Sequence, residues 1–168
     1  MKCSIKKFSE MYETVYRDLY RYALCLMKNP QEAEDAVSEA VIAAYENIHK
    51  LKKEEAFKSW IFTILTNKCK KRLKKALKEE PGREEELPEQ PVVPDYDLAM
   101  DVRKAFFVLS EEEQILVGLS VFGGYCSQEI GEMMRLNPNT VRSKRSRALK
   151  KMECVLGSYG EDEKERRE

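Results

Sequence analysis

Apolar residues recur at intervals of three and four along most of the chain, which is the spacing of one face of an α-helix. This periodicity predicts amphipathic helices over residues 9–28, residues 30–48 and about residues 57–77. It stops near residue 80 and resumes from residue 98 toward the C-terminus. The pattern therefore predicts an all-α fold with two small helical domains.

The segment between the two helical groups, residues 80–94, is rich in Pro and Glu and has no periodic apolar residues. Such a composition is typical of an extended, flexible linker. We therefore expect a first domain at residues 1–78, a flexible acidic linker at residues 79–96 and a second domain at residues 97–157. Residues 158–168 are polar, which predicts a frayed tail.

Two of the predicted helix starts carry capping residues. Asn29 can cap the second helix, Pro30 suits its first position, and Glu32 stands where a capping box needs an acid. In the second domain, Ser110 and Glu113 have the spacing of another capping box. We therefore expect helices to begin at Pro30 and directly after Ser110.

Residues 127–151 contain two short helical patterns that meet at a turn, which predicts a helix-turn-helix. Thr140 can cap the second helix, and Val141, Ala148 and Leu149 have the spacing needed to pack it onto the first. Its other face is rich in cations and hydroxyls, which suits a DNA major groove, where Arg reads guanine and Lys holds phosphates. The candidate residues for this contact are Thr140, Arg142, Ser143, Lys144, Ser146, Arg147 and Lys150. A solvated, charge-rich helix end is the alternative interpretation.

Charge is strongly segregated along the chain, although the formal net charge is +0. Residues 49–78 are basic and residues 79–101 are acidic, so the chain has separate charged surfaces, of which the basic ones can meet a polyanion. Trp60, the single tryptophan, lies in the basic block, where it can pack in the core or, with neighbouring cations, capture unpaired bases. The candidate residues for single-strand contact are Phe57, Lys58, Trp60, Asn67, Lys68 and Lys71.

The predicted helix at residues 30–48 has an acidic side without Lys or Arg. The acids on this side are Glu32, Glu34, Asp35, Glu39 and Glu46. Acids in the first turn suit the helix dipole, whereas acids that continue to Glu46 indicate a docking face for a basic partner. A solvated face is an equally good interpretation from this helix alone.

The cysteines, the single histidine and the lengths of the apolar runs exclude several kinds of site and protein. The 5 cysteines are scattered without a CxxC pair, so neither a disulfide framework nor a zinc knuckle is indicated, and we expect reduced thiols. His49 is the only histidine, which excludes a multi-histidine metal site. An enzyme such as a nuclease, with a metal on Asp35, Glu39 and the acids of the linker, is an alternative, but no histidine or nucleophile accompanies these acids. With no membrane-length apolar run and no signal-peptide core, we expect a cytoplasmic protein without cofactor, metal or membrane insertion.

Both halves contain stretches that resemble the extracytoplasmic-function group of sigma factors, in the sigma-70 family of bacterial RNA polymerase subunits. In the first half these are LYRYALCLMKNPQEAEDAVSEAVIAAYENI and FKSWIFTILTNKCKKRLKK, which look like sigma region two. In the second half, LSEEEQILVGLSVFGGYCSQEIGEMMRLNPNTVRSKRSRALKKM looks like sigma region four. The resemblance covers nearly the whole chain and includes the order of the two halves.

The resemblance implies a sigma factor that binds core RNA polymerase, directs it to promoters and helps to melt them, without a catalytic site of its own. It implies docking on the clamp helices of the polymerase's largest subunit through Asp35, Ser38, Glu39 and Ile42. The single-strand candidates would then hold the minus-ten element of the promoter, and the helix-turn-helix candidates would hold the minus-thirty-five element. The linker would thread toward the active-site and RNA-exit channels of the polymerase. An anti-sigma factor is an expected partner. A stand-alone helix-turn-helix regulator is the alternative function.

Some positions depart from the common pattern of the family. Ser38 and Val41 stand where Gln and Phe are usual, and Lys71 replaces a residue that is often Asn. Cys126 caps a helix poorly, so we expect the following serine to shift the start of the helix-turn-helix. Arg145 replaces a usual Leu or Ile, and we expect it to extend outward and add a phosphate contact, because its burial without a partner would be costly.

Overall fold

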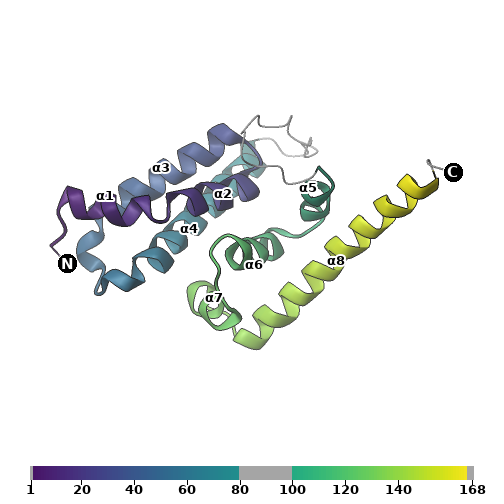
Figure 1. Ribbon diagram of the computed structural model, residues 1–168. Coiled ribbons are helices and arrows are strands. Elements are labelled where there is room, and N and C mark those ends of the chain that lie inside the picture. The colour runs from purple at the N-terminus through teal and green to yellow at the C-terminus, as the bar shows by residue number, and fades with distance from the viewer. Residues whose placement is uncertain (1, 80–99, 166–168) are drawn as a thin grey trace. The chain divides into compact units, whose positions relative to one another are not determined.

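The computed structural model describes residues 2–79 and 100–165 (Figure 1), with side chains described at residues 2–79 and 102–157. The chain divides into two compact units, with the boundary between Pro91 and Val92. All regular structure in the described residues is helical, which confirms the all-α prediction. Apart from Glu79, the predicted linker at residues 79–96 lies outside the described residues, as does residue 98.

The first unit is a bundle of α1 (Ile5–Glu13), α2 (Tyr16–Met27), α3 (Pro30–Glu46) and α4 (Phe57–Glu79), with two short 3-10 turns at Ile48–Lys50 and Glu54–Ala56. Helices α2, α3 and α4 pack against one another along most of their length (Figure 1). Small residues of α3 let its neighbours approach closely, and large apolar side chains of α2 and α4 fill the core. The fully buried residues include Leu19, Tyr22, Leu26, Ala33, Ala36, Ala40, Ile61, Phe62 and Leu65. Each large apolar side chain contributes roughly 1.5–3 kcal/mol by leaving water.

The single helix predicted at residues 9–28 is two helices, so this prediction was wrong. The chain breaks at Thr14 and Val15, where the Thr14 hydroxyl donates to the Met11 carbonyl at 2.7 Å and the Val15 amide donates to the Tyr12 carbonyl at 3.0 Å. Both residues are β-branched and lose side-chain freedom in a helix. The break turns Val15 into the core, where it is 4% exposed.

The predicted start of α3 at Pro30 is confirmed, but the predicted capping box is only half formed. Asn29 Oδ1 accepts hydrogen bonds from the amides of Gln31 at 2.8 Å and Glu32 at 3.2 Å. The Glu32 carboxylate, which a capping box would turn back to Asn29, instead accepts a hydrogen bond from Arg72 on α4. A charged donor binds a carboxylate more strongly than a backbone amide does, so the contact between helices wins.

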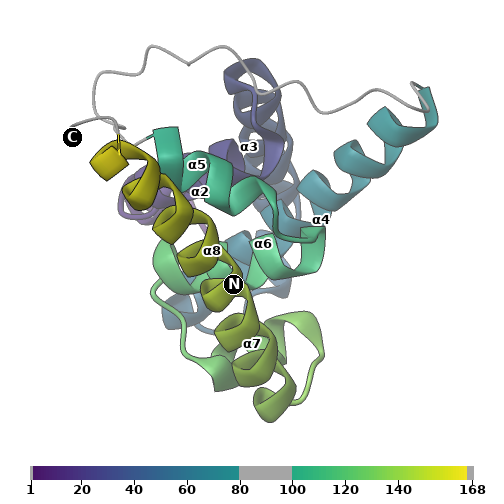
Figure 2. The ribbon, with the colours of Figure 1, turned by 90° about the vertical axis from the view of Figure 1, so that its right-hand side faces the viewer.

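The second unit consists of α5 (Met100–Phe107), α6 (Glu111–Val121), α7 (Ser127–Met134) and the long α8 (Pro138–Glu165). Helix α8 contacts each of the other three, and its length is visible in Figure 2. The core of this unit contains Ala105, Phe106, Leu109, Ile115, Leu116, Leu119, Ile130, Val141 and Ala148.

Two predictions about α8 were wrong. Leu149 does not pack onto the preceding helix, because it is 48% exposed. The predicted frayed tail from residue 158 is helical as far as Glu165. Glycine costs only about 1 kcal/mol in a helix, so α8 can continue through Gly157 and Gly160.

The predicted start of α6 directly after Ser110 is confirmed. The Ser110 hydroxyl accepts from the Glu113 amide at 3.3 Å, and the Glu113 carboxylate accepts from the Ser110 amide at 3.1 Å. Gly123 and Gly124 follow the end of α6, and Gly124 has a φ of 70°, which favours glycine. A Cβ on Gly123 would lie 2.7 Å from the Leu119 carbonyl oxygen, so this position also needs glycine. No described helix is both long and apolar enough to cross a membrane.

Candidate nucleic-acid and polymerase interfaces

The helix-turn-helix consists of α7 and the first turns of α8, and the cap of α8 is Asn137 rather than Thr140. Asn137 Oδ1 accepts from the Asn139 amide at 2.8 Å, and its carbonyl accepts from the Val141 amide at 3.0 Å. Asn137 and Pro138 thus repeat the arrangement that starts α3, which the interpretation of Thr140 overlooked. Thr140 lies within the first turns of α8 and is partly exposed.

The start of α7 also differs from expectation. Cys126 occupies the capping position and Ser127 is already the first helical residue. The Cys126 amide donates to Glu129 Oε2 at 2.8 Å, so the acid of α7 satisfies the backbone that a cysteine thiol satisfies poorly.

Helix α8 divides its polar side chains between two directions. Arg142, Ser143, Ser146, Arg147 and Lys150 are exposed. The Arg142 guanidinium donates to Asn139 Oδ1 at 2.9 Å, a contact within the first turn that leaves the side chain on the surface. These residues form the face that was predicted for DNA contact, and we call them the α8 outer face.

Three other cations of α8 bind α6 instead. Lys144 Nζ lies 2.7 Å from Glu112, Lys151 Nζ lies 2.7 Å from Glu113, and Arg145 Nη1 donates to the Ser120 hydroxyl at 3.3 Å. The prediction for Arg145 was wrong, because its guanidinium turns inward to a hydroxyl partner rather than outward to a phosphate. Lys144 is paired with Glu112, and its contact with DNA stays a prediction.

The Glu113 carboxylate has a lowered pKa because of the contacts that join α6 and α8. The hydrogen bond from Lys151 lowers the pKa of its carboxyl below the ordinary value, and the Ser110 amide acts in the same direction, whereas burial opposes both. One carboxylate thus caps α6 and fixes α8 against it.

On α4, the predicted single-strand residues separate into one buried residue and a surface group. Phe57 is 3% exposed and its ring packs edge-on against Phe8, with centroids 5.6 Å apart, so it belongs to the core and is not available to stack on a base. Its role in base contact was predicted from its place beside Trp60 and the cations of the basic block, which does not distinguish a buried aromatic from an exposed one. The side chains that reach the surface are Lys58, Trp60, Asn67, Lys68 and Lys71.

Trp60 lies between the core of the first unit and its surface. Its ring centroid lies 6.4 Å from that of Phe57, and the side chain is partly exposed. It therefore rests on the core while one part of the indole faces solvent. Asn67 and Lys71 are exposed further along α4.

The predicted docking residues of α3 are all at the surface in the described structure. Ser38, Glu39 and Ile42 are exposed, and the large apolar side chain of Ile42 is 59% exposed. Asp35 is partly exposed and accepts a hydrogen bond from Gln31 at 3.1 Å.

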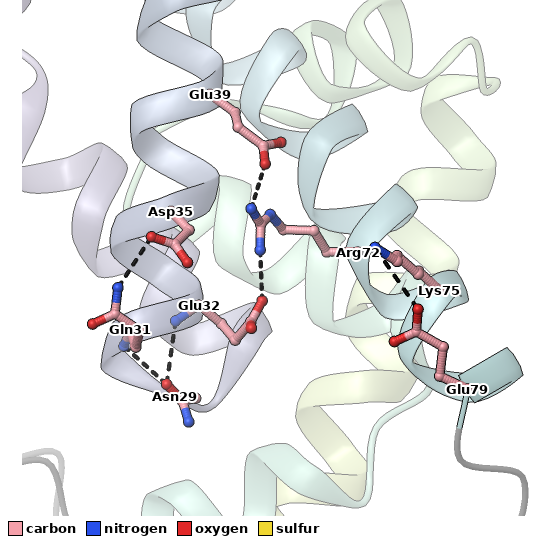
Figure 3. A network of polar contacts seen from close by, with 8 residues as sticks. All are labelled: Asn29, Gln31, Glu32, Asp35, Glu39, Arg72, Lys75 and Glu79. Atoms are coloured by element: carbon pink, nitrogen blue, oxygen red, sulfur yellow. Dashed lines mark hydrogen bonds and ion pairs between the residues drawn. The ribbon is translucent and has the colours of Figure 1, made fainter.

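Arg72 of α4 is a residue that the sequence interpretation missed. Its guanidinium lies between two acids of α3 (Figure 3): Nη1 is 2.7 Å from Glu32 Oε2, and Nη2 donates to Glu39 Oε1. Burial lowers the pKa of Arg72, but the hydrogen bonds to Glu39 and Glu32 outweigh it, so the pKa is raised overall. The acidic side of α3, cation-free along its own sequence, thus receives a cation from α4. Two acids seven residues apart share one face of α3, but this spacing does not indicate which cation of another helix pairs with them.

The chain is similar to known proteins over most of its length. The family Sigma-70 region 2 matches residues 11–79, and the family Sigma-70, region 4 matches residues 100–152. The ECF RNA polymerase sigma factor SigM of Mycobacterium tuberculosis is 26% identical over 152 residues, which are 89% of this chain and 77% of that protein. The RNA polymerase sigma factor SigV of Bacillus subtilis is 28% identical over 141 residues, with 83% and 85% covered.

Two solved structures share the fold. The sigma factor RpoE of Bartonella quintana, in complex with the anti-sigma factor NepR, matches with a TM-score of 0.81 at 23% identity, over 91% of this chain and 98% of that chain. CnrH, in complex with the cytosolic domain of CnrY, matches with a TM-score of 0.69 at 16% identity, over 92% and 90%.

Proposed function

This chain belongs to the extracytoplasmic-function group of sigma factors in the sigma-70 family and directs RNA polymerase to promoters, and we propose which of its surfaces performs each step. The first unit docks on core polymerase and holds the opened minus-ten element. The second unit binds the minus-thirty-five element as duplex. The protein itself supplies no catalytic group and no cofactor; the chemistry of RNA synthesis is that of the polymerase.

The α8 outer face enters the major groove of the minus-thirty-five element. The observation that carries this step is the division of cations on α8, which leaves Arg142 and Arg147 exposed while Lys144 binds Glu112. Arginine can donate two hydrogen bonds to one guanine, and lysine holds phosphates without regard to sequence. We therefore assign base contacts to Arg142 and Arg147, and a phosphate contact to Lys150.

The surface group of α4 holds the unpaired non-template strand. A partly exposed indole supported by Phe57 gives a rigid face on which a base can stack. Lys58 lies two residues before it on α4, and Lys68 and Lys71 lie about two and three turns further along the same helix, where they can hold the backbone of the strand. Capture of an extruded base offsets an unstacking cost of a few kcal/mol. Phe57 acts through Trp60 as support and makes no base contact.

The exposed face of α3 docks on core polymerase through Asp35, Ser38, Glu39 and Ile42. An exposed isoleucine next to acids supplies both an apolar contact and charge attraction to a basic partner. The same face suits an anti-sigma factor, which would exclude the polymerase by covering it. We place the protein in the cytoplasm, where polymerase and promoter DNA are found.

Transcription from the DNA upstream of its own gene tests this function. Purified core polymerase should make a transcript with a defined start only when the protein is added. In a gel-shift with the protein alone, duplex promoter binding should be weak, because the polymerase is needed to hold both units on DNA at once. Tight binding by the protein alone, without an added transcript, would instead identify a stand-alone helix-turn-helix regulator.

A further inference from the structure

The contact between Arg72 and the acids of α3 joins two surfaces that the proposed function keeps separate. Glu39 belongs to the docking face of α3, and Arg72 directly follows Lys71 in the strand-binding group of α4. A single guanidinium therefore spans the helix that meets the polymerase and the helix that meets DNA (Figure 3).

Geometry makes this contact more than a surface ion pair. Glu32 and Glu39 are seven residues apart, close to two helical turns, so their carboxylates lie on one side of α3. The planar guanidinium offers separate N–H groups to each, which a lysine ammonium cannot do in the same fixed arrangement. The Arg72 side chain is 23% exposed, against 47% and 46% for the two acids.

Arg72 also stands where the packing of α4 ends. Leu65, Thr66 and Cys69 are buried in the turns before it, whereas all side chains from Lys74 to Glu79 are exposed. Arg72 Nε is buried and has no hydrogen-bond partner within the described part of the chain, so the side chain is held by its two terminal nitrogens. The guanidinium is therefore the last fixed point between α4 and α3.

We propose that Arg72 is a positioning residue that sets α4 against α3, so that docking on polymerase places Asn67, Lys68 and Lys71 correctly for strand capture. Without it, α3 keeps its docking face and α4 keeps its cations, but the two are no longer held in one orientation. This inference rests on the proposed function. It predicts a defect in promoter opening that is larger than any defect in polymerase binding.

The test compares Arg72→Met, which keeps the length of the side chain, with the wild-type protein in three assays. These are affinity for core polymerase, open-complex formation on duplex promoter, and complex formation on the same promoter with a pre-melted minus-ten region. Arg72→Met should lower opening of the duplex by about tenfold, the effect of a small misplacement of a positioned group. Its polymerase affinity should change by less than about threefold, and the pre-melted promoter should restore most of the activity.

Two further variants separate geometry from charge. Arg72→Lys keeps the charge but can satisfy only one acid, so it should open duplex promoter to an intermediate extent. Glu32→Gln, outside the docking group, should show a smaller defect of the same kind, and combining it with Arg72→Met should add nothing. Lys75→Met is the matched control, because its exposed pair with Glu79 is 3.7 Å long, and it should change opening by less than about twofold.

Three results would overturn the proposal: unchanged duplex opening by Arg72→Met, full activity of Arg72→Lys, or an equal loss by Arg72→Met in all three assays. The last would mean that Arg72 only stabilises the fold, and thermal unfolding of the variant would then fall in parallel. If the wild-type protein itself failed to bind polymerase, the proposed function would fail and this inference with it. If the wild-type protein opens promoters and Arg72→Met opens them equally well, the inference alone is rejected and the proposed function stands.

Discussion

The two cation-rich helices, α4 and α8, use their charges in different ways. In α4, one arginine binds two acids of a neighbouring helix, and it is the least exposed member of that contact. In α8, Lys144 and Lys151 each bind a separate acid of α6. The first arrangement joins two acids of one helix through a single guanidinium, whereas the second distributes separate ion pairs along a helix whose apolar face already packs.

The comparison also shows how a helix can serve both its domain and DNA. Each helix commits some cations to the fold and leaves others at the surface. A count of Lys and Arg therefore overstates the charge available to a nucleic acid. The following predictions test that division.

The largest expected effects come from the two separate cores. Leu65→Ala in the first unit and Leu116→Ala in the second each remove a fully buried side chain and should cost about 2–5 kcal/mol in their own unit. Trp60 is the only tryptophan and lies in the first unit, so its fluorescence in urea reports that unit. Leu65→Ala should shift this transition to lower urea, and Leu116→Ala should leave it in place. Equal shifts would mean that the units unfold together.

The next effects concern the α8 outer face. Arg142→Ala and Arg147→Ala should each lose about 1–3 kcal/mol of holoenzyme binding at one base pair of the minus-thirty-five element. Lys150→Ala should weaken binding to all sequences evenly and reduce its salt dependence. Binding to a set of single-base promoter variants at several salt concentrations measures both. The assignment fails if all three variants are equally insensitive to sequence.

Lys144 tests the distinction between free and committed cations directly. Because Lys144 binds Glu112, Lys144→Met should reduce the stability of the second unit by about 0.2–1 kcal/mol, typical of a partly exposed pair. It should leave discrimination among minus-thirty-five sequences unchanged. Urea unfolding followed by circular dichroism gives the first quantity, and the promoter-variant set gives the second. A loss of discrimination without a loss of stability would return Lys144 to the DNA-binding group.

The smallest effect is a pH dependence in the second unit. The pKa of Glu113 is lowered in the folded protein, so its contribution is present above the ordinary value of 4.5 and is lost as pH falls through the lower folded value. Glu113→Gln should remove the part of the stability loss at low pH that comes from protonation of Glu113. The amide oxygen of Gln can still accept the hydrogen bond from the Ser110 amide. Glu111→Gln, in the same first turn, is the control. Urea midpoints at pH 7 and below pH 4.5 compare the three proteins, and identical pH profiles would contradict the role of Glu113.

Local signals accounted for most of the fold. Asn29 with Pro30, and Ser110 with Glu113, are short-range capping patterns, and each began a helix where predicted. Asn137 with Pro138 carries the same signal as the first pair, so the error at Thr140 was avoidable. The break at Thr14 was harder to predict, because the apolar periodicity continues through it and only the weak helix preference of two β-branched residues marks the site.

Contacts over long separations could not be predicted from the sequence. Arg72 meets its acids across 33 and 40 residues, and nothing in a run of lysines marks one arginine as a partner for α3. The inward turn of Lys144 and Arg145 likewise depends on where α6 lies against α8. Phe57 shows a further limit, since an aromatic residue at a helix start fits a core and a binding surface equally well.

The most direct test of the central claim is permanganate reactivity of thymines in promoter DNA, measured with core polymerase, with the protein, and with both. The account predicts reactive thymines in the minus-ten region only when core polymerase and the protein are both present. It predicts that these thymines lose their reactivity when the protein carries Trp60→Ala and Lys71→Ala together. Reactive thymines with core polymerase alone, or undiminished reactivity in that variant, would contradict it.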